Sequence, residues 1–289
     1  YNQGRERERL RRGAGALELA RTQEVVRRHL PPPPAEILDV GGGPGVYAAW
    51  LARAGYRVHL VDPVPLHLSQ AQEAAAAQPA SPFTAALGDA RHLDAADASC
   101  DAVLLLGPLY HLPERADRLA ALAEACRVLR PGGVAFIAAI SRFGSLLDAV
   151  RQGYVADPEA MAVIEATVRG GHNENPGLDR FPGWFPTAHF HLPDELANEI
   201  TACGLTFDHV VGVEGPGGFI GDGADDPDQQ AHLLRAARLV EREPNLLGLS
   251  PHLLAIARKV SSSPDPRCEK MAAGNPARHL PDYPVTTRR

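Results

Sequence analysis

The stretch Ile37-Leu38-Asp39-Val40-Gly41-Gly42-Gly43-Pro44-Gly45 decides the fold of this 289-residue chain. It opens with a short apolar run and ends in closely spaced glycines, a pattern typical of a buried parallel strand that turns into a helix. Glycines in such a turn can adopt positive φ angles and let the backbone approach a ligand closely. We therefore predict a strand over residues 37–40, a ligand-binding turn, and a helix over residues 46–54.

Downstream of this turn the chain keeps alternating between short apolar runs and helical patterns. Further strands are predicted at residues 58–61, 83–87, 102–106, 134–140, 205–213 and 253–260, and helices at 66–78, 116–129 and 193–203. Repeated βα units imply a parallel sheet with helices on both faces. The predicted fold class is α/β, with a Rossmann-like, doubly wound, mostly parallel sheet of seven strands.

The remaining residues form an arm, two insertions and a tail around the core, which we assign to residues 35–141 and 193–260. The segments are residues 1–34, a helical arm or lid that ends in four prolines; 142–192, a helical cap; 215–250, a second insertion; and 261–289, a polar tail expected to be disordered. Insertions between late strands commonly cover the carboxyl edge of the sheet, where ligands bind.

The overall composition narrows the class of protein. A formal net charge of −6 with no basic domain argues against a nucleic-acid partner. The four cysteines are scattered and no histidines have zinc spacing, so we expect neither a metal nor a disulfide framework. The first residues lack an apolar signal core and no apolar stretch is long enough to span a membrane, which predicts a cytoplasmic protein without a membrane partner.

The glycine spacing distinguishes between nucleotide ligands. Gly41, Gly43 and Gly45 form G-x-G-x-G, and Val46 stands where a dinucleotide site has its third glycine. This turn resembles motif I of the class I S-adenosylmethionine-dependent methyltransferases. The later run from Asp101 to Leu112 resembles the fourth strand and active-site loop of their small-molecule, ubiquinone-methyltransferase-like type. The resemblance implies that the glycine loop runs beside the amino acid end of the cofactor and that Asp39 helps to hold its ammonium group.

Four later motifs follow in the order of that family, so that the resemblance covers about residues 37 to 140. The last of them is Leu129-Arg130-Pro131-Gly132-Gly133, a turn into the fifth strand that binds nothing directly. Asp62-Pro63 ends the second strand about 20 residues after the glycine loop, where a carboxylate can accept both ribose hydroxyls. The family pattern implies that Asp89 and the amide of Ala90 contact adenine and that Gly107 borders the cofactor. As alternatives, Asp62 is a helix cap and Asp89 lies in an ordinary surface turn.

Methyl transfer from a sulfonium requires placement more than catalytic side chains. Where the acceptor must lose a proton, His111 and His189 are the candidate bases. The spacing of His189 and His191 in an extended segment points both side chains to one face. The alternative for each is a structural histidine, and we prefer that alternative for His191.

Aromatic and polar residues after strand ends and in the cap are candidates for the acceptor pocket. The predicted acceptor contacts are Tyr110, Arg142, Phe143, Trp184 and Phe190. Cap aromatics are equally consistent with a small core of their own. Tyr1, on the arm, is the predicted lid residue over the cofactor.

The sequence therefore predicts an enzyme that uses S-adenosyl-L-methionine to methylate O, N or C of a small molecule, releases S-adenosyl-L-homocysteine, and serves specialised metabolism. The loop Gly107-Pro108-Leu109-Tyr110 lacks an Asn-Pro-Pro-Tyr-like signature, which weighs against methylation of base or glutamine amino groups. The sequence leaves the oligomeric state undecided between a monomer and a homodimer. The alternatives are a non-catalytic sensor or scaffold that binds the cofactor and, less favoured, a nicotinamide-dependent oxidoreductase.

Overall fold

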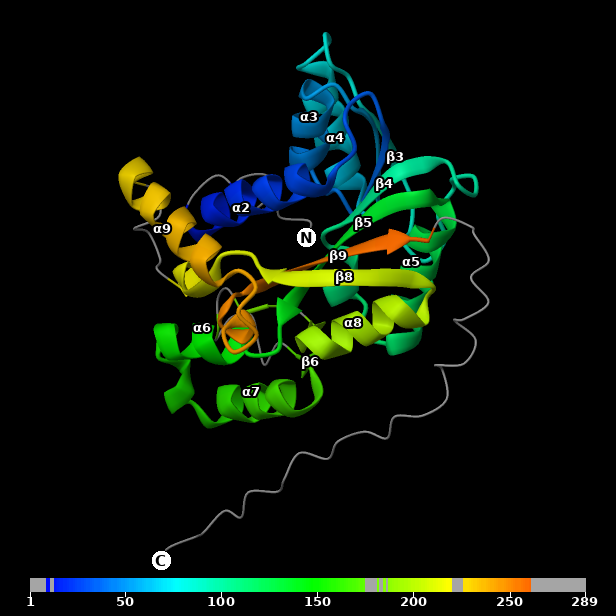
Figure 1. The fold of residues 1–289 in the computed structure, drawn as a ribbon. Coiled ribbons are helices and arrows are strands. Elements are labelled where there is room, and N and C mark those ends of the chain that lie inside the picture. The colour runs from blue at the N-terminus through cyan, green and yellow to red at the C-terminus, as the bar shows by residue number, and fades with distance from the viewer. Residues whose placement is uncertain are drawn as a thin grey trace, which may run out of the picture.

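The computed structural model describes residues 9–10, 13–174, 181, 184–185, 187–219 and 226–260. A sheet runs through the centre of the molecule and carries helices on both faces (Figure 1). Its parallel strands lie in the order β3 (Thr84–Leu87), β2 (Arg57–Asp62), β1 (Glu36–Val40), β4 (Cys100–Leu105) and β5 (Leu129–Ser141). Beyond β5, the antiparallel strand β9 (His252–Lys259) pairs with β5 on one side and with β8 (Leu205–Gly212) on the other.

The prediction of a doubly wound, mostly parallel α/β sheet is confirmed, but the number of strands is not. The sheet has nine strands, because β6 (His172–Asn173) and β7 (Ala188–His191) extend it at the carboxyl end of β5. We predicted no strand in the cap. Strands of two and four residues are too short to show the alternation of apolar and polar residues by which strands are predicted.

The two faces of the sheet are covered by different helices. One face packs on α5 (Arg115–Val128) and α8 (Pro193–Ala202), and the other on α2 (Gly13–His29), α3 (Val46–Arg53) and α4 (Pro65–Ala76). Because side chains alternate along a strand, Leu38 and Val40 face the first layer, and Ile37 faces the second. Asp39 shares the parity of Ile37, so its carboxylate lies on the α3 side of the sheet.

The cap contains α6 (Gly144–Gln152), η2 (Tyr154–Ala156) and α7 (Pro158–Gly170), which lie together at one end of the molecule (Figure 1). Its buried residues form a separate small cluster that includes Ile164, Phe181 and Trp184. On the other side of the sheet, α9 (Pro227–Val240) packs against α2, and η3 (Gly215–Phe219) and η5 (Leu247–Leu249) lie near the start of β9. No helix in the described part of the chain is both long and apolar enough to cross a bilayer.

Candidate active site

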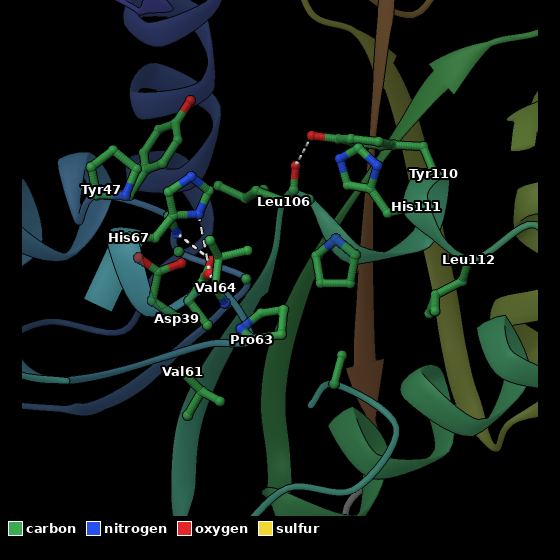
Figure 2. Close-up of a pocket in the computed structure, with 18 of the residues that line it drawn as sticks. Asp39, Tyr47, Val61, Pro63, Val64, His67, Leu106, Tyr110, His111 and Leu112 are labelled. Carbon is green, nitrogen blue, oxygen red and sulfur yellow. Dashed lines mark hydrogen bonds and ion pairs between the residues drawn. The ribbon is translucent and has the colours of Figure 1, made fainter. Parts of the chain in front are cut away.

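A cavity of about 600 Å³ opens at the carboxyl edge of the sheet (Figure 2). The carboxyl ends of parallel strands meet at this edge, which is where α/β proteins bind ligands. Figure 2 shows Asp39 and His67 on one side of the cavity and Tyr110 and His111 on the other. The predicted cofactor residues that border it are Asp39, Gly41, Gly43, Asp62, Pro63, Asp89, Ala90 and Gly107. Tyr1 lies outside the described residues.

The glycine turn needs its glycines for two separate reasons. Gly41 has a φ of 68°, and a Cβ added there would lie 2.7 Å from the ring of Pro108, in the loop after β4. Gly45, with a φ of 85°, is the residue before α3, and a Cβ there would lie 2.9 Å from Phe83. Gly45 therefore shapes the start of α3 and does not border the cavity, unlike our expectation of a cofactor contact.

Asp39 is the most unusual group in the cavity. Its side chain is fully buried, and neither carboxylate oxygen has a hydrogen-bond partner among the described residues. Burial first, and the nearby charge of Asp62 second, raise the pKa of Asp39 to about 7, against the opposing effect of the Ala48 backbone amide, which lies near the carboxylate without forming a hydrogen bond of normal geometry. Leaving a buried carboxylate without a partner is costly. The position is consequently suited to a ligand that brings a cationic hydrogen-bond donor.

Asp62 is already bonded within the protein. Its Oδ2 accepts from the amide of Gly43 at 2.9 Å, and its Oδ1 accepts from the amide of Val64 at 2.9 Å and contacts Nδ1 of His67 at 3.1 Å. The carboxylate thus braces the glycine turn and caps the approach to α4. A carboxylate offers about four acceptor positions, so roughly one remains for a ribose hydroxyl, where the resemblance implied bonds to both.

The predicted adenine contact is also engaged. Asp89 accepts from Nη2 of Arg91 at 2.6 Å and from the backbone amide of Arg91 at 2.8 Å. The hydrogen bonds from Arg91 lower the pKa of Asp89. A ligand at this position therefore meets a carboxylate fixed by its neighbour.

An aromatic wall forms the outer half of the cavity. His111 stacks on Phe185 with ring centroids 5.7 Å apart, and Tyr110 meets both rings edge-on at 4.6 and 5.8 Å. The Tyr110 hydroxyl donates to the carbonyl of Leu106 at 3.1 Å (Figure 2). Burial lowers the pKa of His111 to about 4, so its imidazole is neutral at pH 7.

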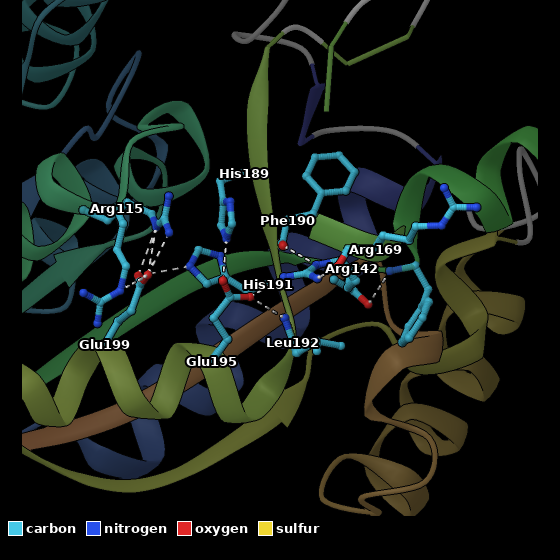
Figure 3. Close-up of polar contacts among 12 residues, drawn as sticks. Arg115, Arg142, Arg169, His189, Phe190, His191, Leu192, Glu195 and Glu199 are labelled. Carbon is cyan, nitrogen blue, oxygen red and sulfur yellow. Dashed lines mark hydrogen bonds and ion pairs between the residues drawn. The ribbon is translucent and has the colours of Figure 1, made fainter. Parts of the chain in front are cut away.

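His189, the second predicted base, does not line the cavity. Figure 3 shows its side chain directed towards Glu195. His189 and His191 do point to one face of β7, with ring centroids 4.6 Å apart. There they meet α8, where Nε2 of His189 lies 2.9 Å from Glu195 and Nε2 of His191 lies 3.3 Å from Glu199. Neither histidine borders the cavity, so their contacts indicate a structural role.

Only Tyr110 of the five predicted acceptor contacts borders the cavity. Arg142 donates from Nε to the carbonyl of Phe190 at 2.8 Å and forms an ion pair with Glu195 (Figure 3). Trp184 belongs to the cap cluster, and Phe143 packs near Gly248. Arg142 and Phe143 follow the end of β5, as predicted, whereas Trp184 packs in the small core of the cap, which was the alternative for the cap aromatics.

A charged group that no sequence motif predicted lies beside the cavity. Glu18 from α2, Glu214 from the segment after β8, and His252 at the start of β9 bring ligand-type atoms within 4.8 Å of one another. Arg9 forms an ion pair with Glu18, and both Arg9 and His252 border the cavity. These residues lie too far apart in the sequence to form a motif.

Comparison with known proteins gives a family match for part of the chain. Residues 37–133, which include the glycine turn and the predicted cofactor residues after it, match the family model described as a methyltransferase domain. This segment is therefore similar to the methyltransferase domain of S-adenosylmethionine-dependent methyltransferases. The matched domain and the fold imply S-adenosylmethionine as the cofactor, and the nicotinamide alternative loses its support.

The curated relatives match this chain over part of their length. Methyltransferase GfsG of Streptomyces halstedii is 37% identical over 149 residues, which cover 50% of this chain and 52% of that protein. A ubiquinone biosynthesis O-methyltransferase of Methylobacterium sp. (strain 4-46) is 29% identical, with 61% and 62% covered. The chain therefore spans between half and two thirds of these two curated relatives.

Solved structures extend the likeness of fold. A SAM-dependent methyltransferase from Methanosarcina mazei superposes with a TM-score of 0.57 at 21% identity, over 82% of this chain and 97% of that one. One from Mesorhizobium loti gives a TM-score of 0.57 at 19% identity, over 84% and 100%. At these identities the likeness concerns the fold alone.

Proposed function

We propose that this methyltransferase transfers the methyl group of S-adenosylmethionine to O, N or C of a small molecule held in the outer half of the cavity. The observation that carries the proposal is the buried carboxylate of Asp39, which has no partner and faces the same cavity as the aromatic wall. A carboxylate left unpaired at this depth is consistent with a ligand that carries an ammonium group, as the cofactor does.

The inner half of the cavity would hold the cofactor. Asp39 would pair with its ammonium group, and the remaining acceptor position of Asp62 would take a ribose hydroxyl. The amide of Ala90, with Asp89 beside it, would contact adenine. When bound, the cofactor supplies a methyl group on a sulfonium that is already activated for in-line displacement. The protein contributes alignment and exclusion of water.

His111 is the proposed base on the acceptor side. Its imidazole is neutral at pH 7, because burial lowers its pKa to about 4. A base this weak accepts a proton only as the acceptor becomes acidic, so proton removal would accompany methyl transfer. The proposal for His189 is a structural role, because its Nε2 is held by Glu195 outside the cavity.

The chemistry of the acceptor follows from the wall that it meets. Tyr110, His111 and Phe185 present a flat, largely apolar surface, which suits a planar or partly apolar small molecule. A net charge of −6 supports such an acceptor over a nucleic acid. The likeness to a ubiquinone biosynthesis O-methyltransferase supports a role in biosynthesis, and we propose specialised metabolism as the branch in which this role lies.

A second candidate function is a protein that binds the cofactor without transferring its methyl group. One neighbour of similar fold, with a TM-score of 0.52 and 18% identity, is a [4+2]-cyclase. The fold alone therefore does not guarantee methyl transfer. Turnover of an acceptor separates the two candidates.

Calorimetric titration with S-adenosylmethionine, S-adenosylhomocysteine and NADH tests the proposal. We expect micromolar binding of the first two and none of the third. Asp39→Asn should weaken both by at least about tenfold, because a neutral amide forms no charge-assisted bond with the ammonium. Asp97→Asn, an exposed site paired with Arg127, is the matched control and should bind normally. NADH binding alone, or full affinity in Asp39→Asn, would refute the assignment.

A further inference from the structure

We infer that His252 forms a subsite of the cavity that binds an anionic oxygen of the acceptor, namely a carboxylate. This inference rests on the proposed function, because it describes the acceptor of that reaction. His252 is the first residue of β9 and pairs with Ile140 near the carboxyl end of β5. It therefore lies at the sheet edge that forms the cavity, and it borders the cavity itself.

The imidazole is held in one orientation by Glu214. Nδ1 of His252 lies 2.5 Å from Oε1 of Glu214 and 3.8 Å from Oε2 of Glu18. The other oxygen of Glu214 accepts from the Ser250 hydroxyl at 3.0 Å and from the backbone amide of His252 at 3.2 Å. The buried Glu214 thus fixes the side of the ring that carries Nδ1.

The opposite ring nitrogen is left for a ligand. Within the described residues, Nε2 of His252 has no hydrogen-bonding partner, and the side chain keeps 23% of its surface exposed. A protonated imidazole donates from both nitrogens. With Nδ1 bound to Glu214, Nε2 is the donor that remains for a molecule in the cavity.

The neighbouring charges favour the protonated ring. Burial opposes protonation, but Glu18 and Glu214 raise the pKa of His252 to about 9. Arg9, which lies near the ring and lowers this pKa, is itself paired with Glu18 at 2.5 Å. Because two cations balance two carboxylates, an acceptor meets a positively charged N–H donor rather than a net negative cluster.

A divalent metal is the other occupant that this group could attract, because the three ligand-type atoms lie within 4.8 Å of one another. The contacts favour the anion. A metal needs a neutral imidazole nitrogen and free carboxylate oxygens, whereas Nδ1 is bonded to Glu214 and Glu18 is paired with Arg9. Metal binding is therefore an outcome of the test that would overturn the inference.

The test compares two probes of the same shape, 4-hydroxybenzoate and 4-hydroxybenzamide, by ligand-observed NMR with and without S-adenosylhomocysteine. We expect the carboxylate to bind at least about tenfold more tightly than the amide at pH 7. His252→Asn should abolish that preference and leave S-adenosylhomocysteine affinity unchanged. His172→Asn is the control, because His172 is also paired with a glutamate, Glu174, but lies outside the cavity.

A pH series on the unmodified protein gives a second readout that needs no variant. The preference for the carboxylate should persist at pH 7 and disappear as the pH rises through about 9, where His252 loses its proton. Equal affinities, no binding of either probe, or a preference that survives His252→Asn would overturn the inference. Binding of Mn²⁺ that is lost in Glu214→Gln would overturn it too. Failure of S-adenosylhomocysteine to bind would instead count against the proposed function.

Discussion

The carboxylates at the cavity and at the base of the cap differ in how they are paired within the protein. Asp39, at the cavity, has no partner, and its pKa is raised to about 7 by burial and by Asp62. Glu195 and Glu199, between β7 and α8, are satisfied by His189, His191 and arginines; despite burial, these partners hold both pKa values at about 2 (Figure 3). The carboxylates that attach the cap are paired with histidines and arginines of the protein, whereas the Asp39 carboxylate at the cavity has no such partner in the described part of the chain.

The largest effect that we expect is on the closed network. Glu199 accepts from Nη2 of Arg118 at 2.7 Å and contacts His191, and all three side chains are almost fully buried. Glu199→Gln should lower the free energy of unfolding by about 3–5 kcal/mol, because it leaves the Arg118 charge without its counter-ion. Denaturant unfolding at pH 7 measures this loss. The exposed pair Glu165–Arg169 gives the control, Glu165→Gln, which should cost less than about 0.5 kcal/mol. A small loss in Glu199→Gln would mean that the network does not hold the cap.

Replacing Asp39 should change the free energy of unfolding in the opposite direction to replacing Glu199. The folded pKa of Asp39 lies above its ordinary value of 3.8, so stability is present below pH 3.8 and is lost as the pH rises through about 7. Asp39→Asn removes this loss and should stabilise the protein relative to the parent by on the order of 2–4 kcal/mol at pH 7, but not at pH 4. Thermal or denaturant unfolding across this range measures the difference.

For Glu195 and Glu199 the pKa values are depressed, so their stabilisation is present above about pH 4.5 and is lost as the pH falls towards 2. Asp39→Asn should leave this acid limb in place. If the variant is not stabilised between pH 4 and pH 7, Asp39 is not held as an unpaired charge, and the contrast with the network fails.

The same contrast explains what the sequence could predict. The inner half of the cavity comes from one continuous stretch, in which each strand end contributes its motif, so Asp39, Asp62 and Ala90 could be located before the fold was known. The charged group beside the cavity joins Glu18, Glu214 and His252 from distant segments, and His252 is the member that borders the cavity. No local period or spacing brings such residues together, because only the sheet order does so.

The role of His189 was predicted only in part. The sequence correctly predicted that His189 and His191 share a face, but not that glutamates of α8 pack against that face. Glu195 and Glu199 are one helical turn apart on α8, a distance of about 6 Å along the axis, while residues two apart in a strand are separated by about 6.6 Å. This matching repeat of acids and histidines was a readable signal for a structural pairing.

The third prediction concerns His111, the proposed base at the cavity. His111→Gln should reduce turnover of the acceptor found by screening by at least about 10²-fold, because the proposed base is lost. Its affinity for S-adenosylhomocysteine should stay within about twofold, since the ring belongs to the aromatic wall. Single-turnover kinetics with radiolabelled S-adenosylmethionine provides the measurement. Unchanged turnover would mean that the acceptor needs no base, which is compatible with transfer to a neutral nitrogen or sulfur atom.

The smallest effect belongs to His189, the histidine that the sequence offered as an equal candidate. His189→Asn removes one hydrogen bond to Glu195, which keeps its ion pair with Arg142. We expect a loss of about 1–2 kcal/mol in the free energy of unfolding and normal turnover under conditions in which the variant is folded. The two variants should therefore differ in their main effect. His111→Gln should lower the turnover rate, and His189→Asn should lower the free energy of unfolding. If turnover fell as far as in His111→Gln while stability stayed unchanged, His189 would take part in the reaction. The contrast between the paired network and the cavity would then be wrong.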